Sequence, residues 1–289
     1  MAFRPRIANE GNSAMAYSFA TIATPGTTPR CWYYMLREID PRARRYSAIV
    51  LPVDDYDDED WEDLAGRVSD LYYLLPILRV SDLREFSMSY PANAARWDAC
   101  RGGLLKGWSY RRDFQDLLVN HKRRMLEVNW TRTESAKSFY NFVWTTNSLK
   151  GMNVDWAARK ISYPPDTTEE QKRVLNNVLL RTTAPQVGYL AAYRRKWFGK
   201  IVEHYRGSHT RLIFLRLPRG PVVRPYPVVK KSSSIREFAS HPQVALLDEH
   251  LFDELEHPEL FVDSLHMNGP GSARFSELLA AEVARILGR

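Results

Sequence analysis

The stretch Arg211-Leu212-Ile213-Phe214-Leu215-Arg216-Leu217 decides the fold class, because it is a nearly continuous apolar run of strand length. Residues 218–221, Pro-Arg-Gly-Pro, end it. Before it, residues 186–205 place apolar side chains at helical spacing, which predicts a helix. A helix followed by a buried strand and a loop is typical of a βαβ unit. The pattern therefore predicts an α/β fold with a parallel sheet.

Further elements fit this rhythm on both sides of the strand. Short apolar runs predict strands over 17–23, 45–53 and 243–247. Helices are expected over 30–39, from a capping box at residues 167–170 to about 180, and in the last 20 residues, where Ser272 is a plausible cap. We therefore expect a three-layer αβα, flavodoxin-like arrangement. Residues 1–79 and 164–289 would form the α/β body, and 80–163 a mostly helical insertion.

The predicted insertion is rich in tryptophan and in basic residues. Residues 104–125 carry six Lys or Arg side chains against Asp113 and Asp116. One interpretation is an aromatic core with a charged outer face. The other is a surface that stacks sugars or bases and binds an anionic chain. Asn147, three residues after Trp144, could turn toward the cleft and is a candidate substrate-binding residue.

An acidic run, residues 54–60, follows the strand expected over 45–53. Ligands collect beyond the carboxyl ends of parallel strands, so this run could rim a site or bind a cation. A solvated helix start is the favoured interpretation, because these carboxylates would complement the dipole of a helix beginning near Trp61. We therefore predict no metal site.

Composition sets outer bounds on the function. The chain has 289 residues, a net charge of +7 and two cysteines without metal-binding spacing. The basic surplus is compatible with acidic glycans, anionic membrane surfaces or nucleic acid, but no nucleic-acid recognition motif accompanies it. No apolar run reaches the roughly 20 residues that span a bilayer, and no signal peptide opens the chain. We therefore expect a soluble chain without a transmembrane segment.

The strongest chemical signal lies just before the last helix, where Asp263 and His266 are three residues apart. A carboxylate can hold one ring nitrogen of a histidine and leave the other free to take a proton from a hydroxyl nucleophile. A surface hydrogen bond or a capping arrangement is the alternative.

Residues 261–272, Phe-Val-Asp-Ser-Leu-His-Met-Asn-Gly-Pro-Gly-Ser, closely resemble the last block of the SGNH (GDSL-like) hydrolases. More narrowly, the block looks like the bacterial cell-envelope branch linked to O-acyl transfer onto polysaccharides. The resemblance gives Asp263 and His266 the acid and base roles of a Ser-His-Asp triad. It also matches residues 24–29 to the block whose glycine amide, here that of Gly26, helps to hold the oxyanion.

The resemblance leaves two positions in doubt. Asp55 lies where the family often has an asparagine that donates to the oxyanion, and a carboxylate cannot donate unless it is protonated. Ser13, in Gly11-Asn12-Ser13, matches the nucleophile, but residues 3–10 make a poor buried strand, and too few residues follow for a crossover helix. Alternatively, Met1 is an internal methionine of a longer ancestor, and the nucleophile and any membrane anchor lie upstream.

Two functions remain open. The first is a serine esterase or O-acyltransferase acting on acyl esters of cell-surface carbohydrate, with no cofactor. Asn147 and Asn268 would bind the substrate, and a membrane acyltransferase would be a partner by resemblance. The second is an inactive protein of the same fold that binds carbohydrate or another anionic polymer. The resemblance implies a periplasmic or cell-envelope location if an upstream anchor has been lost.

Overall fold

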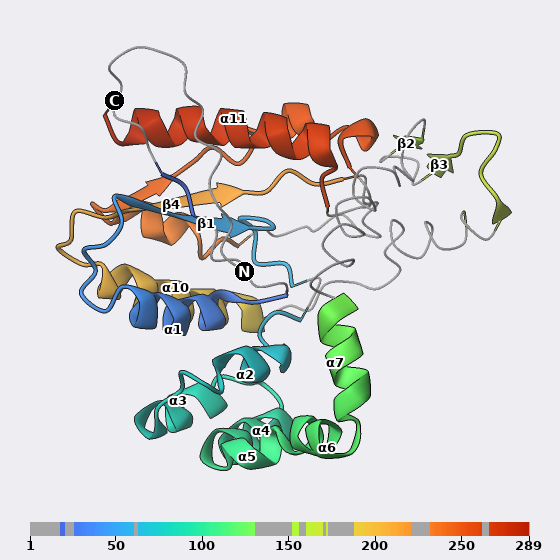
Figure 1. The fold of residues 1–289 in the computed structure, drawn as a ribbon. Helices are drawn as coiled ribbons and strands as arrows, with labels where there is room; N and C mark the ends of the chain where they lie inside the picture. Colours follow the sequence, from blue (N-terminus) through green and yellow to red (C-terminus); the bar gives the residue numbers. More distant parts are fainter. Residues whose placement is uncertain are drawn as a thin grey trace.

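The computed structural model shows a mixed α/β protein built on a small parallel sheet (Figure 1). It describes residues 18–20, 26–60, 63–130, 152–155, 160–169, 172, 188–220, 232–261 and 266–288. Within these ranges the parallel sheet contains β1 (Ala48–Val53), β4 (Arg211–Arg216) and β5 (Val244–Leu246), in the order β1-β4-β5. Ala48 pairs with Arg211 and Leu212 with Val244. The strand that the sequence marks most clearly is therefore the central one.

Helices cover both faces of this sheet (Figure 1). On one face lie α1 (Pro29–Ile39) and α10 (Tyr189–His204), and on the other lies α11 (Gly269–Ile286). Side chains alternate along β4 to match: Leu212 and Phe214 belong to the core shared with α1 and α10, whereas Ile213 and Leu215 belong to the core beneath α11. A strand buried on both faces explains why the sequence of β4 is continuously apolar.

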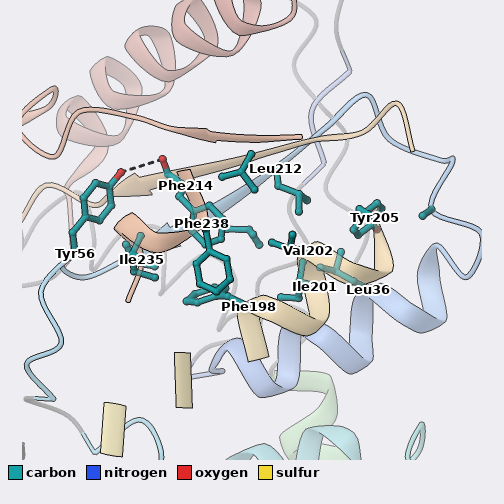
Figure 2. Packing of buried hydrophobic residues seen from close by; sticks show 14 residues of the cluster. Leu36, Tyr56, Phe198, Ile201, Val202, Tyr205, Leu212, Phe214, Ile235 and Phe238 are labelled. Carbon is teal, nitrogen blue, oxygen red and sulfur yellow. Dashed lines mark hydrogen bonds between the residues drawn. The ribbon is translucent and has the colours of Figure 1, made fainter. Parts of the chain in front are cut away.

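Aromatic rings form the centre of the first core. Phe198 of α10 packs edge-on against Phe214 with ring centroids 5.0 Å apart, and Phe238 stacks on Phe214 at 5.9 Å. Figure 2 shows these rings between the sheet and the helices. The buried Tyr56 closes the cluster, since its hydroxyl donates to the carbonyl oxygens of Phe214, at 3.1 Å, and Leu247, at 2.7 Å. Edge-to-face aromatic contacts stabilise such a core beyond the area that they bury.

A helical region packs against the outer side of α1 and α10. Its elements are α2 (Ser69–Leu74), a 3-10 turn η1 (Val80–Asp82), α3 (Leu83–Ser87), α4 (Asn93–Leu104), α5 (Lys106–Ser109), α6 (Arg111–Val119) and α7 (His121–Trp130). Leu74, Phe86 and Tyr90 form one core with Tyr34 of α1 and Trp197 of α10. Residues 80–130 are thus helical, as predicted, and the helices begin before residue 80.

The second half of the predicted insertion contains strands as well. β2 (Asn153–Asp155) and β3 (Lys160–Ser162) pair as an antiparallel hairpin.

Two 3-10 turns, η4 (Asp253–Leu255) and η5 (Pro258–Leu260), follow β5, and another, η3 (Arg236–Ser240), precedes it. Asn147 lies outside the described residues, as does most of the helix predicted to end near 180. Within the described chain, no helix is long and apolar enough to cross a bilayer.

Three local predictions were wrong. Residues 63–68 form turns rather than a helix, and the next helix begins only at Ser69. Residues 18–20, the described part of the strand predicted over 17–23, lie outside any strand. The cap of α11 is Asn268 rather than Ser272, because the Asn268 side chain accepts the backbone N–H of Gly271.

Candidate active site at the carboxyl edge of the sheet

The carboxyl ends of β1 and β4 point to the same edge of the sheet as the N-terminal ends of α1 and α11 (Figure 1). Parallel α/β sheets bind their ligands at this edge, because helix N-termini and strand-end loops converge there. Gly26 precedes α1 and His266 precedes α11. Two of the residues predicted from the resemblance therefore lie on loops that lead to this edge.

Gly26 has a left-handed backbone, with φ at +70°. The space around a side chain there is open, since only the Arg67 Nη1 atom lies 4.0 Å from a built Cβ. The backbone angle therefore explains the glycine, because other residues adopt this region at a cost. Arg67 Nη1 donates to the Gly26 carbonyl oxygen at 3.3 Å and holds the turn.

His266 is exposed and lies in a short loop closed by a bridge between Phe261 and Met267. Residues 262–265, with Asp263 among them, lie outside the described residues, as does Ser13. The predicted Asp263–His266 bond and the predicted nucleophile therefore stay predictions.

Asn268 fixes the helix that follows His266. Its Oδ1 atom accepts from the Gly271 amide at 3.0 Å, and its Nδ2 atom donates to the Glu259 carbonyl oxygen at 2.5 Å. Gly271 is buried, and a Cβ there would lie 2.3 Å from the Leu260 carbonyl oxygen. Both polar atoms of Asn268 are thus used within the protein. These bonds give Asn268 a structural role, and its predicted contact with substrate stays a prediction.

The β2–β3 hairpin also contacts the His266 loop. Met152, which precedes β2, and Ile161 of β3 pack with Phe261 and Met267, the two residues that flank this loop. Nothing in the sequence pattern predicted this contact. The hairpin therefore borders the candidate base.

Asp55 accepts hydrogen bonds at both carboxylate oxygens. Oδ1 accepts from the Asp57 amide at 3.2 Å, and Oδ2 accepts from Arg219 Nη1 at 3.3 Å. Both carboxylate oxygens of Asp55 are thus engaged as acceptors, and this arrangement supplies no donor to an oxyanion. The doubt that the sequence raised about this position therefore has a structural basis.

Most of the acidic run is buried, contrary to the solvated helix start that we expected, although Asp54 is exposed and Glu59 half-buried. Asp57, Asp58 and Asp60 are 2%, 7% and 3% exposed. The buried Arg194 of α10 donates to the carbonyl oxygens of Asp55, at 2.9 Å, and Asp57, at 2.7 Å, and to Asp58 Oδ1 at 3.3 Å. The run is thus fixed by a cation from a distant helix, which its own sequence could not reveal.

Asp58 has further partners in the segment that leads to β5. Its carboxylate accepts from the Ser234 hydroxyl at 2.6 Å and the Ser234 amide at 2.8 Å. Among the residues that the structure describes, no group of three or more His, Cys, Asp or Glu side chains is arranged to hold a metal ion. The loop after β1 is therefore held by hydrogen bonds and ion pairs.

A second cluster at this edge was missed from the sequence. Arg216, at the end of β4 and 5% exposed, pairs with Asp253 and with Glu256, the latter at 2.5 Å. Asp253 also lies 2.7 Å from Nδ1 of the exposed His250. The hydrogen bond and the charge of Asp253 raise the pKa of His250. Arg216, Asp253, Glu256 and His250 therefore form a network of ion pairs around the end of β4.

Comparison of the chain with protein-family models, with curated proteins and with solved structures finds no match in any of the three.

Proposed function

We propose that the chain is an SGNH-like serine esterase or O-acyltransferase acting on acyl esters of cell-surface carbohydrate. The observation that carries this proposal is the exposed His266 on the loop before α11, at the sheet edge toward which the loop of Gly26 also leads. A parallel sheet with helices on both faces is compatible with the finer three-layer, flavodoxin-like fold proposed with it.

The chemistry follows the triad scheme. His266, oriented by Asp263, takes the proton of a serine hydroxyl as its oxygen attacks the ester carbonyl, and backbone amides near Gly26 stabilise the resulting oxyanion. The tetrahedral intermediate collapses, the alcohol leaves with the proton from the imidazole, and the acyl group stays on the serine. The imidazole then takes a proton from water or from a sugar hydroxyl, whose oxygen attacks the acyl-enzyme, and returns this proton to the serine. Attack by water gives hydrolysis, and attack by a sugar hydroxyl gives transfer.

Ser13 is the proposed nucleophile within this chain. The scheme needs no cofactor, since the ester bond supplies an activated acyl group. By the same resemblance we propose a cell-envelope location and a membrane acyltransferase as the source of the acyl group.

Hydrolysis of p-nitrophenyl acetate tests the proposal. His266→Ala should lower the rate by about a thousandfold or more, because it removes the base of a triad. His250→Ala is the matched control, since it removes another exposed histidine that lies after β5 rather than on the loop before α11, and it should leave the rate unchanged. Ser13→Ala separates the two nucleophile alternatives: equal loss with His266→Ala supports Ser13, and an unchanged rate means another nucleophile. Equal rates for wild type and His266→Ala would refute the proposal.

A further inference from the structure

Exposed large apolar side chains are concentrated in the helical region. Of those in the described chain, all but Phe19 and Tyr189 lie between residues 68 and 128. Single exposed apolar residues are normal for a protein surface, whereas a large contiguous apolar patch is typical of a surface that binds a partner.

The concentration is strongest on α6 and α7. We define the α6–α7 surface by their exposed apolar side chains: Phe114, Leu117, Leu118, Val119, Met125, Leu126 and Val128. Leu118 is 77% exposed and Leu126 70%. No side chain described in these two helices is buried. Helices of 9 and 10 residues are marginal by themselves and gain their stability from covering an apolar face. The α6–α7 surface is therefore the kind that is covered in the working protein.

The same segment carries a surplus of positive charge. Residues 104–130 contain six Lys or Arg and three Asp or Glu side chains. Three ion pairs lie within the segment: Arg123 is 3.0 Å from Asp116 and 3.4 Å from Glu127, and Arg124 is 3.6 Å from Asp113. Lys122 is exposed beside them. The occupant must therefore be apolar where it meets the leucines and anionic around them.

We propose that the α6–α7 surface binds the surface of an anionic lipid membrane. A hydrated anionic polymer would pair with the basic side chains but would leave the exposed leucines in contact with water. A symmetric dimer through this face would bring two positive surfaces together. Acidic headgroups above acyl chains satisfy both requirements, as for amphipathic helices that lie in the interface. At about 1.5 Å per residue each helix is roughly 15 Å long, half the hydrocarbon thickness, so the pair lies along the membrane plane.

The test is flotation of the full-length protein with phosphatidylcholine vesicles, with and without phosphatidylglycerol. The wild type should float at least about tenfold more with the anionic vesicles, and salt should weaken this binding because it screens the headgroup charge. Leu118→Ser combined with Leu126→Ser should lower binding about tenfold or more. Val80→Ser is the matched control, since Val80 is 78% exposed on η1, outside α6 and α7, and it should bind like the wild type. Circular dichroism checks that each variant is folded.

Two outcomes overturn the proposal. One is equal flotation of the wild type and the double leucine variant. The other is absence of wild-type flotation with the anionic vesicles; a dimer in light scattering that the leucine variant abolishes would then make the surface an interface between two copies. Neither outcome depends on the proposed esterase, because vesicle binding is measured without substrate.

Discussion

Replacing Arg194 with methionine should destabilise the protein strongly, because this side chain holds the loop after β1. Arg194 is 3% exposed and donates to two carbonyl oxygens and to the Asp58 carboxylate. Methionine keeps much of the apolar volume but leaves a buried carboxylate without its cation. Ser234 still donates to Asp58, but a neutral donor does not replace a charge.

Removing one partner of a buried ion pair costs about 3–5 kcal/mol. For 289 residues, an unfolding entropy of about 2.1 cal/mol/K per residue gives roughly 0.6 kcal/mol per degree. The melting temperature of Arg194→Met should therefore fall by about 5–8 °C.

Thermal unfolding followed by circular dichroism measures this shift, and the neighbouring residue on α10 gives a matched control. Arg195 pairs with Glu237 at the surface, where both side chains are about half exposed. Arg195→Met should shift the midpoint by less than about 2 °C, since water already solvates an exposed pair.

A double-mutant cycle separates the charge from the packing. Asp58→Asn removes the buried negative charge and keeps an acceptor for Ser234. If the orphaned carboxylate causes the loss, Arg194→Met together with Asp58→Asn should cost less than the sum of the single changes. Equal midpoints for Arg194→Met and Arg195→Met would refute the reasoning, and strict additivity would refute its electrostatic part.

Two further predictions concern single groups. Burial alone would raise the pKa of Asp82, but hydrogen bonds from Arg37, at 2.8 and 2.9 Å, and from the Arg79 amide outweigh it and lower that pKa. A carboxyl whose pKa is lowered by folding stabilises the protein above its unfolded-state pKa of about 3.9. This stabilisation is lost as the pH falls through the folded-state pKa. The melting temperature of Asp82→Asn should therefore lie below that of the wild type at pH 7 and converge with it under acid; a constant gap would contradict this. Burial also raises the pKa of the Cys31 thiol, which is fully inaccessible. Ellman's reagent should therefore titrate only Cys100 in the native protein and both thiols in guanidinium, and two native thiols would contradict the placement of Cys31.

The elements that could be predicted from the sequence are those whose pattern is local. The strand predicted over 211–217 is β4, and the one predicted over 243–247 contains β5, because short apolar runs ended by turn residues have few alternatives. The helices around Trp32 and Trp197 also appear close to their predicted bounds.

What could not be predicted depends on partners far away in the chain. Asp58 meets Arg194 across 136 residues, so the sequence around Asp58 looked solvated although this carboxylate is buried. The same holds for the His250 cluster, since Arg216 makes Asp253 a shared partner only after β4 and β5 pair. At the candidate site, the start of the helix after Gly26 was predicted closely, whereas the start of α11 was placed at Ser272 instead of Asn268, and the β2–β3 hairpin beside the His266 loop was not predicted.

The helices α1 and α10 contribute to two cores: Phe198 packs in the core against the sheet, and Trp197 packs in the core of the helical region. Because these two helices belong to both cores, the sheet and the helical region depend on each other for stability. A deletion of residues 69–130 would expose Tyr34 and Trp197, which are now fully inaccessible, and would leave an apolar surface prone to aggregation. The helical region is therefore not an independently folding domain. We expect the protein to unfold in a single thermal transition, without earlier unfolding of the helical region.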